Sequence, residues 1–183
     1  LEYQISPEQI SGQWHYAAAV YDGNEKRIYL DGELVGSEAE SGNISFSNDL
    51  SHYIGWRDSD HRFYGQIDEL SIWDVALLQS EIQSYMTTPP TGIESGLVGY
   101  WNFNEGEGTT LTDQTSNGNN GNNGTIYGAT WSEDVPATST GGGDADYQNA
   151  ADSLMISWSG SDEVSGISTY EYALGSTSGG TDA

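Results

Sequence analysis

Apolar and aromatic positions along the chain fall into short segments that Gly, Asn and Asp interrupt. The segment WHYAAAVY is apolar at both alternating sets of positions, which is typical of a central strand covered on both faces. In IYLDGELVG, Asp31-Gly32 separates two apolar runs and predicts a two-residue hairpin, and Asp22-Gly23 predicts a second turn of this kind. Many short strands at this spacing favour an antiparallel sandwich over an α/β fold. The expected strands are residues 14–21, 26–30, 33–36, 44–46, 52–56, 63–73, 97–103, 124–131, 154–158 and 169–174.

One segment has the periodicity of a helix. Residues 75–86 read VALLQSEIQSYM, with Ile82, Tyr85 and Met86 at helical spacing. Ser80 is the expected N-cap, and the TTPPTG that follows ends the helix. Further along, residues 132–149 are rich in Gly, Ser, Thr and Asp, a composition that indicates an inter-domain linker.

The acidity of the chain narrows the classes of partner. Its 183 residues include 28 acidic and only 4 basic side chains, for a formal net charge of −24. Such a surface repels phosphate backbones and anionic lipids but tolerates cations and neutral glycans, so we expect neither nucleic acid binding nor membrane insertion. The 12 Tyr and 6 Trp supply enough apolar area for a packed core. There is no Cys, which excludes disulfides and thiol chemistry.

Several ordered landmarks resemble the second half of a laminin-G-like domain of the concanavalin A-like type. They are Trp14-His15, the Tyr21-Asp22-Gly23 turn, Asp31-Gly32, Ile54-Gly55 and the strand that runs from Gly65 to Trp73 with its trailing helix. The resemblance implies an all-β, antiparallel jelly-roll β-sandwich with one short helix over residues 1–131, in which the strands that normally precede Trp14 are missing. GLVGYWNFNEGEG and GTIYGATW resemble the segment that usually opens such a domain. We expect residues 97–131 to close the same sandwich, and the alternative is that they open a second repeat.

The C-terminal segment resembles part of another module. Ser157-Trp158, Ser165-Gly166-Ile167, Tyr170-Glu171-Tyr172 and Gly179-Gly180-Thr181 are similar to the first half of a fibronectin type III or Ig-like module of bacterial surface proteins. We therefore expect residues 150–183 to form a separately folded, partial β-sandwich with few contacts across the linker. Because its second half is absent, a neighbouring chain is a candidate partner that would complete the module.

The stretch TDQTSNGNNGNNGTIYG contains the candidate metal site. Asp113 stands at the head of this loop and Asn117, Asn119 and Asn120 follow, which gathers carboxylate, amide and backbone oxygens of the kind that Ca²⁺ binds. The resemblance implies the same, since jelly-roll domains of this type often hold a structural calcium near this loop. The alternative is a plain mobile loop, because the spacing does not match an EF-hand and a second Asn-Asn-Gly unit follows at residues 122–124.

Asp68 is a further candidate metal ligand. In QIDELSIW, alternation places Asp68 on the same side as Leu70 and Ile72 and places Glu69 on the opposite, exposed side. A carboxylate at the margin of a core is costly unless it is paired or metal-bound, and the alternative is that backbone N–H groups or a hydroxyl satisfy it. We expect Asp68 or Glu105 to approach the Asn/Gly loop from a neighbouring strand.

The segment WRDSDHR, residues 56–62, is the candidate ligand-binding loop. Trp56 offers a ring on which a sugar can stack, Asp58 and Asp60 can accept hydrogen bonds from sugar hydroxyls, and Arg62 adds a cationic side chain. The alternative is a solvated hairpin tip with local ion pairs.

No catalytic arrangement is evident in the sequence. Asp31 and Glu33 flank a turn, and Glu105 and Glu107 lie in a turn around Gly106 and Gly108. Neither a Ser/His/Asp order nor a phosphate-binding loop is present. The sequence therefore favours a non-enzymatic, extracellular or cell-surface binding module of a modular bacterial protein, stabilised by calcium, with a glycan or surface polymer as ligand. The alternatives are a structural spacer in a surface fibre and an accessory domain of a polysaccharide-degrading enzyme.

Overall fold

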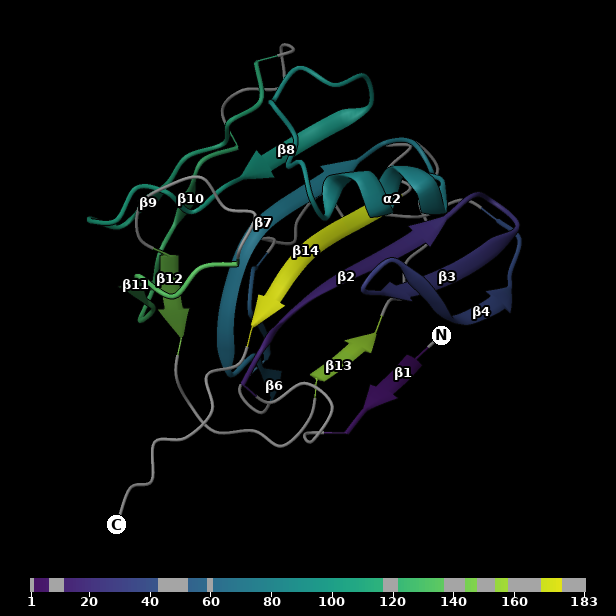
Figure 1. Cartoon of the computed structure of the whole chain (residues 1–183), viewed down its shortest axis with the longest axis horizontal. Coiled ribbons are helices and arrows are strands. Elements are labelled where there is room, and N and C mark those ends of the chain that lie inside the picture. Colours follow the sequence, from purple (N-terminus) through teal and green to yellow (C-terminus); the bar gives the residue numbers. More distant parts are fainter. Residues whose placement is uncertain are drawn as a thin grey trace.

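The computed structural model of the chain describes residues 2–6, 12–42, 53–58, 61–116, 122–136, 144–147, 154–157 and 169–175. Within these ranges the chain forms antiparallel sheets and one short helix, which confirms the all-β class (Figure 1). The elements are β1 (Glu2–Ile5), β2 (Trp14–Tyr21), β3 (Glu25–Leu30), β4 (Glu33–Ala39), β5 (Trp56–Asp58), β6 (His61–Arg62), β7 (Gly65–Trp73), α2 (Gln79–Tyr85), β8 (Leu97–Trp101), β9 (Thr110–Leu111), β10 (Gly124–Thr125), β11 (Thr130–Ser132), β12 (Asp144–Tyr147), β13 (Leu154–Ser157) and β14 (Thr169–Gly175). The main sheet has the order β11-β12-β7-β14-β2-β3-β4, and β8 also pairs with β7.

Some expected strands differ in extent from those observed. The expected strand at residues 44–46 lies outside the described residues. The apolar run that predicted a strand at 52–56 instead leads into β5, which begins at Trp56. Residues 124–131 form two short strands, β10 and β11, because Gly128 has a φ of 80° and interrupts the extended chain.

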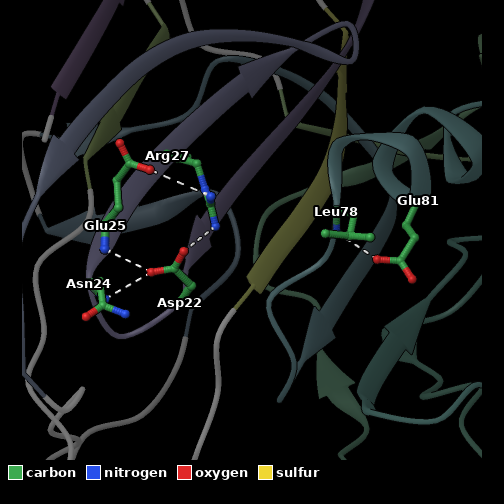
Figure 2. Close-up of polar contacts among 6 residues, drawn as sticks. All are labelled: Asp22, Asn24, Glu25, Arg27, Leu78 and Glu81. Atoms are coloured by element: carbon green, nitrogen blue, oxygen red, sulfur yellow. Dashed lines mark hydrogen bonds and ion pairs between the residues drawn. The ribbon is translucent and has the colours of Figure 1, made fainter.

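Strands β2, β3 and β4 form a meander with the two turns that the sequence indicates. Asp31 and Gly32 have φ values of 51° and 77°, which confirms the two-residue hairpin between β3 and β4. The turn at Asp22 differs, since it spans three residues. Its carboxylate accepts hydrogen bonds from the backbone N–H groups of Asn24 and Glu25, both at 2.9 Å (Figure 2). An Asp side chain that bonds the backbone ahead of it stabilises such a loop, in which Gly23 has a φ of 90°.

Helix α2 begins after Leu78, and the prediction of Ser80 as its N-cap is wrong. The carboxylate of Glu81 accepts a hydrogen bond from the backbone N–H of Leu78 at 2.7 Å (Figure 2). This contact satisfies the free backbone donor at the helix start, so no hydroxyl cap is needed and Ser80 lies inside the first turn. The helix has seven residues, and no helix in the described part of the chain is long and apolar enough to cross a membrane.

The helix docks on the tip of the β3–β4 hairpin. Gln79 Nε2 and Gln83 Nε2 donate hydrogen bonds to the backbone carbonyl of Gly32, at 2.9 and 3.1 Å. A Cβ atom at Gly32 would lie 2.7 Å from Gln83 Cγ and 2.9 Å from Met86 Sδ. Glycine is therefore required at this position both for its positive φ and for the close approach of the helix.

Two apolar clusters cover the two faces of the main sheet. The cluster beneath α2 contains Ala18, Val20, Tyr29, Trp73, Leu77, Ile82, Leu97 and Tyr100. The second cluster contains Leu70, Trp101, Phe103 and Leu111, with Ile67, Ile72, Ile126 and Trp131 packed against it. Adjacent residues of β8, Tyr100 and Trp101, belong to different clusters, so this strand is covered on both faces. Strand β8 pairs with β7 from Leu70 with Trp101 to Trp73 with Leu97, and its buried side chains belong to both clusters.

Strand β7 contains a β-bulge at Glu69. Along β14, Glu171 pairs with Ser71 and Ala173 pairs with Asp68, so β7 supplies one residue more than its neighbour over this interval. Glu69 has a φ of 52°, in the left-handed region that non-glycine residues rarely occupy. The bulge changes which side chains share a face.

The alternation expected for β7 is therefore wrong around Asp68. Ile67 packs in the same cluster as Leu70, a spacing of three residues that regular alternation cannot produce. Alternation from Ile67 places Asp68 on the opposite face from Leu70. Glu69, which was expected to be exposed, is only 6% exposed and bonds the hydroxyl of Tyr100. A single extra residue thus buries two adjacent carboxylates.

The C-terminal strands pair with strands from earlier in the chain. Strand β12 pairs with β7 and β11, β13 pairs with β1, and β14 lies between β7 and β2 (Figure 1). This differs from the expectation that residues 150–183 make few contacts across a linker. The edges of β2 and β7 carry backbone hydrogen-bonding groups that need partners, and β14 satisfies them. The fibronectin type III or Ig-like module is not shown, and the division into domains stays a prediction.

Replacing Ile82 by Ala tests the packing of α2 on the sheet. Ile82 is completely buried in the cluster beneath the helix, so Ile82→Ala should lower the free energy of unfolding by about 2–5 kcal/mol. The matched control is Leu78→Ala, because Leu78 is 66% exposed and the cap that it provides is a backbone contact. Urea denaturation followed by Trp fluorescence measures both. Equal effects of the two substitutions would contradict the burial assigned to Ile82.

Candidate functional site

The Asn/Gly loop, residues 112–124, is closed at its base by hydrogen bonds. The backbone N–H of Asp113 donates to Asn123 Oδ1 at 2.9 Å, and Asn122 Nδ2 donates to Asp113 Oδ2 at 3.0 Å. Trp101 Nε1 donates to the backbone carbonyl of Asn122 at 3.1 Å. Beside these contacts β9 pairs with β10, so the two limbs of the loop are joined. The base of this Asn- and Gly-rich stretch is therefore folded.

The carboxylate of Asp113 is the centre of this base. Asp113 is 6% exposed. Its Oδ1 accepts hydrogen bonds from the backbone N–H of Tyr100 at 3.2 Å, and from the backbone N–H and hydroxyl of Thr115 at 3.0 and 2.8 Å. With the bond from Asn122 to Oδ2, the carboxylate receives four donors. A carboxylate has about four acceptor sites, so its capacity is largely used by the protein.

Two asparagines that were not singled out from the sequence are the described partners of Asp113. Asn117 and Asn119 lie outside the described residues, whereas Asn122 and Asn123, in the second Asn-Asn-Gly unit, make the contacts. That second unit directly precedes the strand-like Thr-Ile-Tyr, and residues next to a strand are fixed in position relative to the opposite limb. The position of Asn122 and Asn123 directly before this strand was the signal that could have identified them as partners of Asp113.

The segment that follows Asp113 is held against the turn before β8. The backbone N–H of Ser116 donates to the carbonyl of Gly92 at 2.9 Å. A Cβ atom at Gly92, where φ is 90°, would lie only 2.3 Å from the carbonyl oxygen of Gln114. No other residue type fits at Gly92 without displacing the backbone of the loop.

Glu94 stabilises that turn. Its carboxylate accepts hydrogen bonds from the backbone N–H and hydroxyl of Thr91, both at 2.7 Å, and from the N–H groups of Gly92 and Ile93, both at 3.0 Å. Burial raises the pKa of the Glu94 carboxyl, but the hydrogen bonds from Thr91 and its neighbours outweigh it and leave the pKa below its usual value. The ionised form of the Glu94 carboxyl therefore stabilises this turn.

Tyr100 connects the loop base to the bulge of β7. Its backbone N–H bonds Asp113, and its hydroxyl donates to Glu69 Oε2. Asp68 is 1% exposed, and its Oδ1 accepts the backbone N–H of Glu69 at 2.9 Å. Burial, then the negative charges of Glu69 and Asp68, raise the pKa of the Tyr100 hydroxyl far above its usual value. The phenol therefore keeps its proton at neutral pH and donates a hydrogen bond to Glu69 Oε2.

Glu105 lies next to the loop base but bonds only its backbone. Its Oε1 accepts the backbone N–H of Thr112 at 2.7 Å. Its Oε2 is buried and accepts no hydrogen bond from the described residues. Glu105 therefore contacts the residue adjacent to Asp113 from a turn after β8, and in the described contacts the two carboxylates share no partner.

The described residues do not fit a calcium site at the loop base. The carboxylate of Asp113 already accepts four hydrogen bonds from N–H and O–H donors, which would have to break before a cation could replace them. In the part of the chain that is described, no three His, Asp or Glu side chains are grouped so as to hold a metal ion. Calcium binding through Asn117 and Asn119 stays a prediction from the sequence, since both lie outside the described residues.

The second candidate site is an exposed pair of aromatic rings. Tyr53 is 58% exposed and Trp56 is 39% exposed. Their ring centroids lie 4.4 Å apart, with an angle of 83° between the ring planes, which is an edge-to-face arrangement. The turn that carries them is closed by a hydrogen bond of 2.8 Å from the backbone N–H of Phe63 to the carbonyl of Gly55. Tyr53 was not singled out from the sequence, although it lies three residues before Trp56.

The backbone places the other predicted ligand-binding residues near this pair. Trp56 is the register partner of Arg62, and Asp58 is the partner of His61, in the two-stranded sheet of β5 and β6. Asp60 lies between these strands and outside the described residues. Trp56 is therefore the predicted ligand-binding residue whose side chain the structure describes.

Asp113→Ala tests the role of the loop base. The substitution leaves four donors without their acceptor and should lower the free energy of unfolding by about 3 kcal/mol. Asp134→Ala is the control, because Asp134 is exposed and its loss changes the net charge equally. Thermal and urea unfolding should be measured in calcium and in EDTA. We expect the loss to be the same in both, and a loss confined to calcium-containing buffer would show that Asp113 acts as a metal ligand.

The lowered pKa of Glu94 predicts a specific dependence of stability on pH. A carboxyl whose pKa is depressed by folding stabilises the protein above its unfolded pKa, and this contribution disappears as the pH falls through the folded pKa. Glu94→Gln should therefore flatten the acid side of the curve of unfolding free energy against pH. The exposed Glu133 gives the control Glu133→Gln. Parallel acid limbs for wild type and Glu94→Gln would refute the assignment.

Comparisons with known proteins agree with the fold of the N-terminal part. Residues 2–83 match the family described as the concanavalin A-like lectin/glucanases superfamily, of the laminin G type. The match supports a laminin-G-like domain in this part of the chain. No solved structure matches the chain.

Two curated relatives are similar to this chain over 83 residues. Pappalysin-1 of Mus musculus is 36% identical over 83 residues, which is 43% of this chain and 5% of that protein. Pappalysin-1 of Homo sapiens is 35% identical over 83 residues, with the same coverage. The chain therefore spans only about 5% of the length of these relatives, and the similarity concerns one region of each.

Proposed function

We propose that the chain is an extracellular, non-catalytic binding module that recognises neutral glycan segments through the Tyr53–Trp56 pair. The observation that carries this proposal is the exposed edge-to-face ring pair on a closed turn. Clustered aromatic side chains at a surface, unlike single ones, mark sites of interaction. A ring pair presents apolar faces with little conformational entropy left to lose, which suits the C–H faces of sugar rings.

The charge of the chain selects among glycans. A net charge of −24 repels sulfated and carboxylated polysaccharides, so the ligand class is a neutral polysaccharide. Lys26 and Arg27 each form ion pairs with acidic side chains, so they do not offset this repulsion. Hydroxyl groups of such a ligand need acceptors, and Asp58 and Asp60 are carboxylates in the adjoining sequence.

Two further features support a binding role outside the cell. The match of residues 2–83 is to a superfamily whose description includes lectins, and the relatives contain a similar region within a much longer protein. A bacterial surface origin and a non-enzymatic role are part of the same proposal.

Binding to neutral glycans tests the proposed function. The chain should bind a neutral oligosaccharide on a glycan array, and titration calorimetry should give its Kd. Trp56→Ala should weaken that binding by roughly tenfold or more, about 1.4 kcal/mol, because it removes one ring of the pair. Tyr127→Ala is the matched control, since Tyr127 is 82% exposed and lies elsewhere in the chain.

The outcomes separate this proposal from its alternatives. Failure of the wild-type chain to bind any neutral glycan would favour the structural spacer. Equal weakening by Trp56→Ala and Tyr127→Ala would place the site elsewhere. Release of shortened oligosaccharides during incubation would show catalysis and overturn the non-enzymatic assignment.

A further inference from the structure

Strand β14 fills a slot in the centre of the main sheet. Its seven residues, Thr169–Gly175, run antiparallel to both neighbours (Figure 1). Along β2 the pairs extend from Thr169 with Val20 to Gly175 with Trp14, and along β7 from Thr169 with Trp73 to Gly175 with Gln66. The slot between β2 and β7 is therefore occupied over nearly the whole length of both strands.

An empty slot would be energetically costly. Strands β2 and β7 are buried on both faces, with Val20 fully buried and both Gln66 and Trp73 only 1% exposed. The other edge of β2 pairs with β3, and the other edge of β7 pairs with β8 and β12. Without β14, two rows of backbone N–H and C=O groups would lose their partners at once. The slot must therefore be filled by β14 or by an equivalent strand.

The occupant comes from a segment that pairs only with distant parts of the chain. In the described residues, β12, β13 and β14 do not pair with one another but with β11 and β7, with β1, and with β2 and β7. Closing a long chain segment onto the slot costs conformational entropy. A second copy of the chain offers the same strand with the same hydrogen bonds. Whether β14 pairs within its own chain or with a second chain therefore depends mainly on the protein concentration.

We propose that the β2–β7 slot is a strand-acceptor site and that β14 of a second copy of this chain can occupy it, which gives a domain-swapped dimer. The interface in the dimer repeats, between two chains, the pairing already present within one chain. The net charge of −24 on each copy opposes the approach of two chains, so exchange should increase with ionic strength.

Disulfide cross-linking tests the proposal directly, because the natural chain has no Cys. Tyr170 is the register partner of Ala19, and antiparallel partners lie within the Cα separation that a disulfide bridges. One full-length variant carries Ala19→Cys, a second carries Tyr170→Cys, and a third carries both. The matched control replaces Ala19→Cys by Ala18→Cys, which is one residue out of register. Ala17→Cys with Tyr172→Cys is the alternative pair if either first variant fails to fold.

The expected results are specific to the register. The double variant, oxidised in dilute solution, should form the 19–170 bond within one chain. The two single variants, mixed at high concentration in high salt and then oxidised, should form the same bond between chains, as peptide mapping would show. The Ala18→Cys mixture should lack this product.

Each other outcome overturns the proposal. A bond within the chain but none between mixed chains would show that β14 does not exchange. No 19–170 bond in any sample would show that β14 does not occupy the slot. Equal yields at 18–170 and 19–170 would show random collision of exposed thiols.

Discussion

Strand β7 has to satisfy hydrogen bonds on both edges and bury side chains on both faces, and the bulge at Glu69 makes this possible. The extra residue brings Ile67 and Leu70 to one apolar cluster and turns Glu69 towards Tyr100 on the other face. Tyr100 in turn donates its backbone N–H to Asp113, which holds the base of the Asn/Gly loop. The position of the loop therefore depends on a backbone irregularity in a strand on the far side of β8.

The features that were read correctly from the sequence are those with a local cause. Asp31-Gly32 predicts its hairpin because both positions need a positive φ, a requirement written in two adjacent residues. The bulge at Glu69 has no such signature, since it arises from the register of β7 against a strand about a hundred residues later, and a left-handed Glu is not a local preference. Alternation failed for Asp68 for this reason alone.

The site was partly predictable for the same reason. Trp56 stood out by composition, and Asp113 stood out as the single carboxylate at the head of an amide-rich stretch. The role of Asp113 could not be predicted from the sequence, because a carboxylate beside several Asn residues can bind either a cation or a set of N–H donors. The choice between the two depends on the backbone N–H of Tyr100 and the hydroxyl of Thr115, which meet Asp113 only in the folded chain. In the same way Ser80 was a reasonable cap until the side chain of Glu81 reached Leu78.

The contacts of Asn122 and Asn123 with Asp113 separate the stability of the loop base from the length of its tip. The described hydrogen bonds that close the base involve Asp113, Asn122 and Asn123, near its two ends, and do not depend on how many residues connect them. Lengthening a loop whose ends are already fixed costs little free energy, since the closure entropy grows only logarithmically with length. The described contacts that close the base should therefore persist when the connection between Ser116 and Asn122 is lengthened or shortened by a few residues.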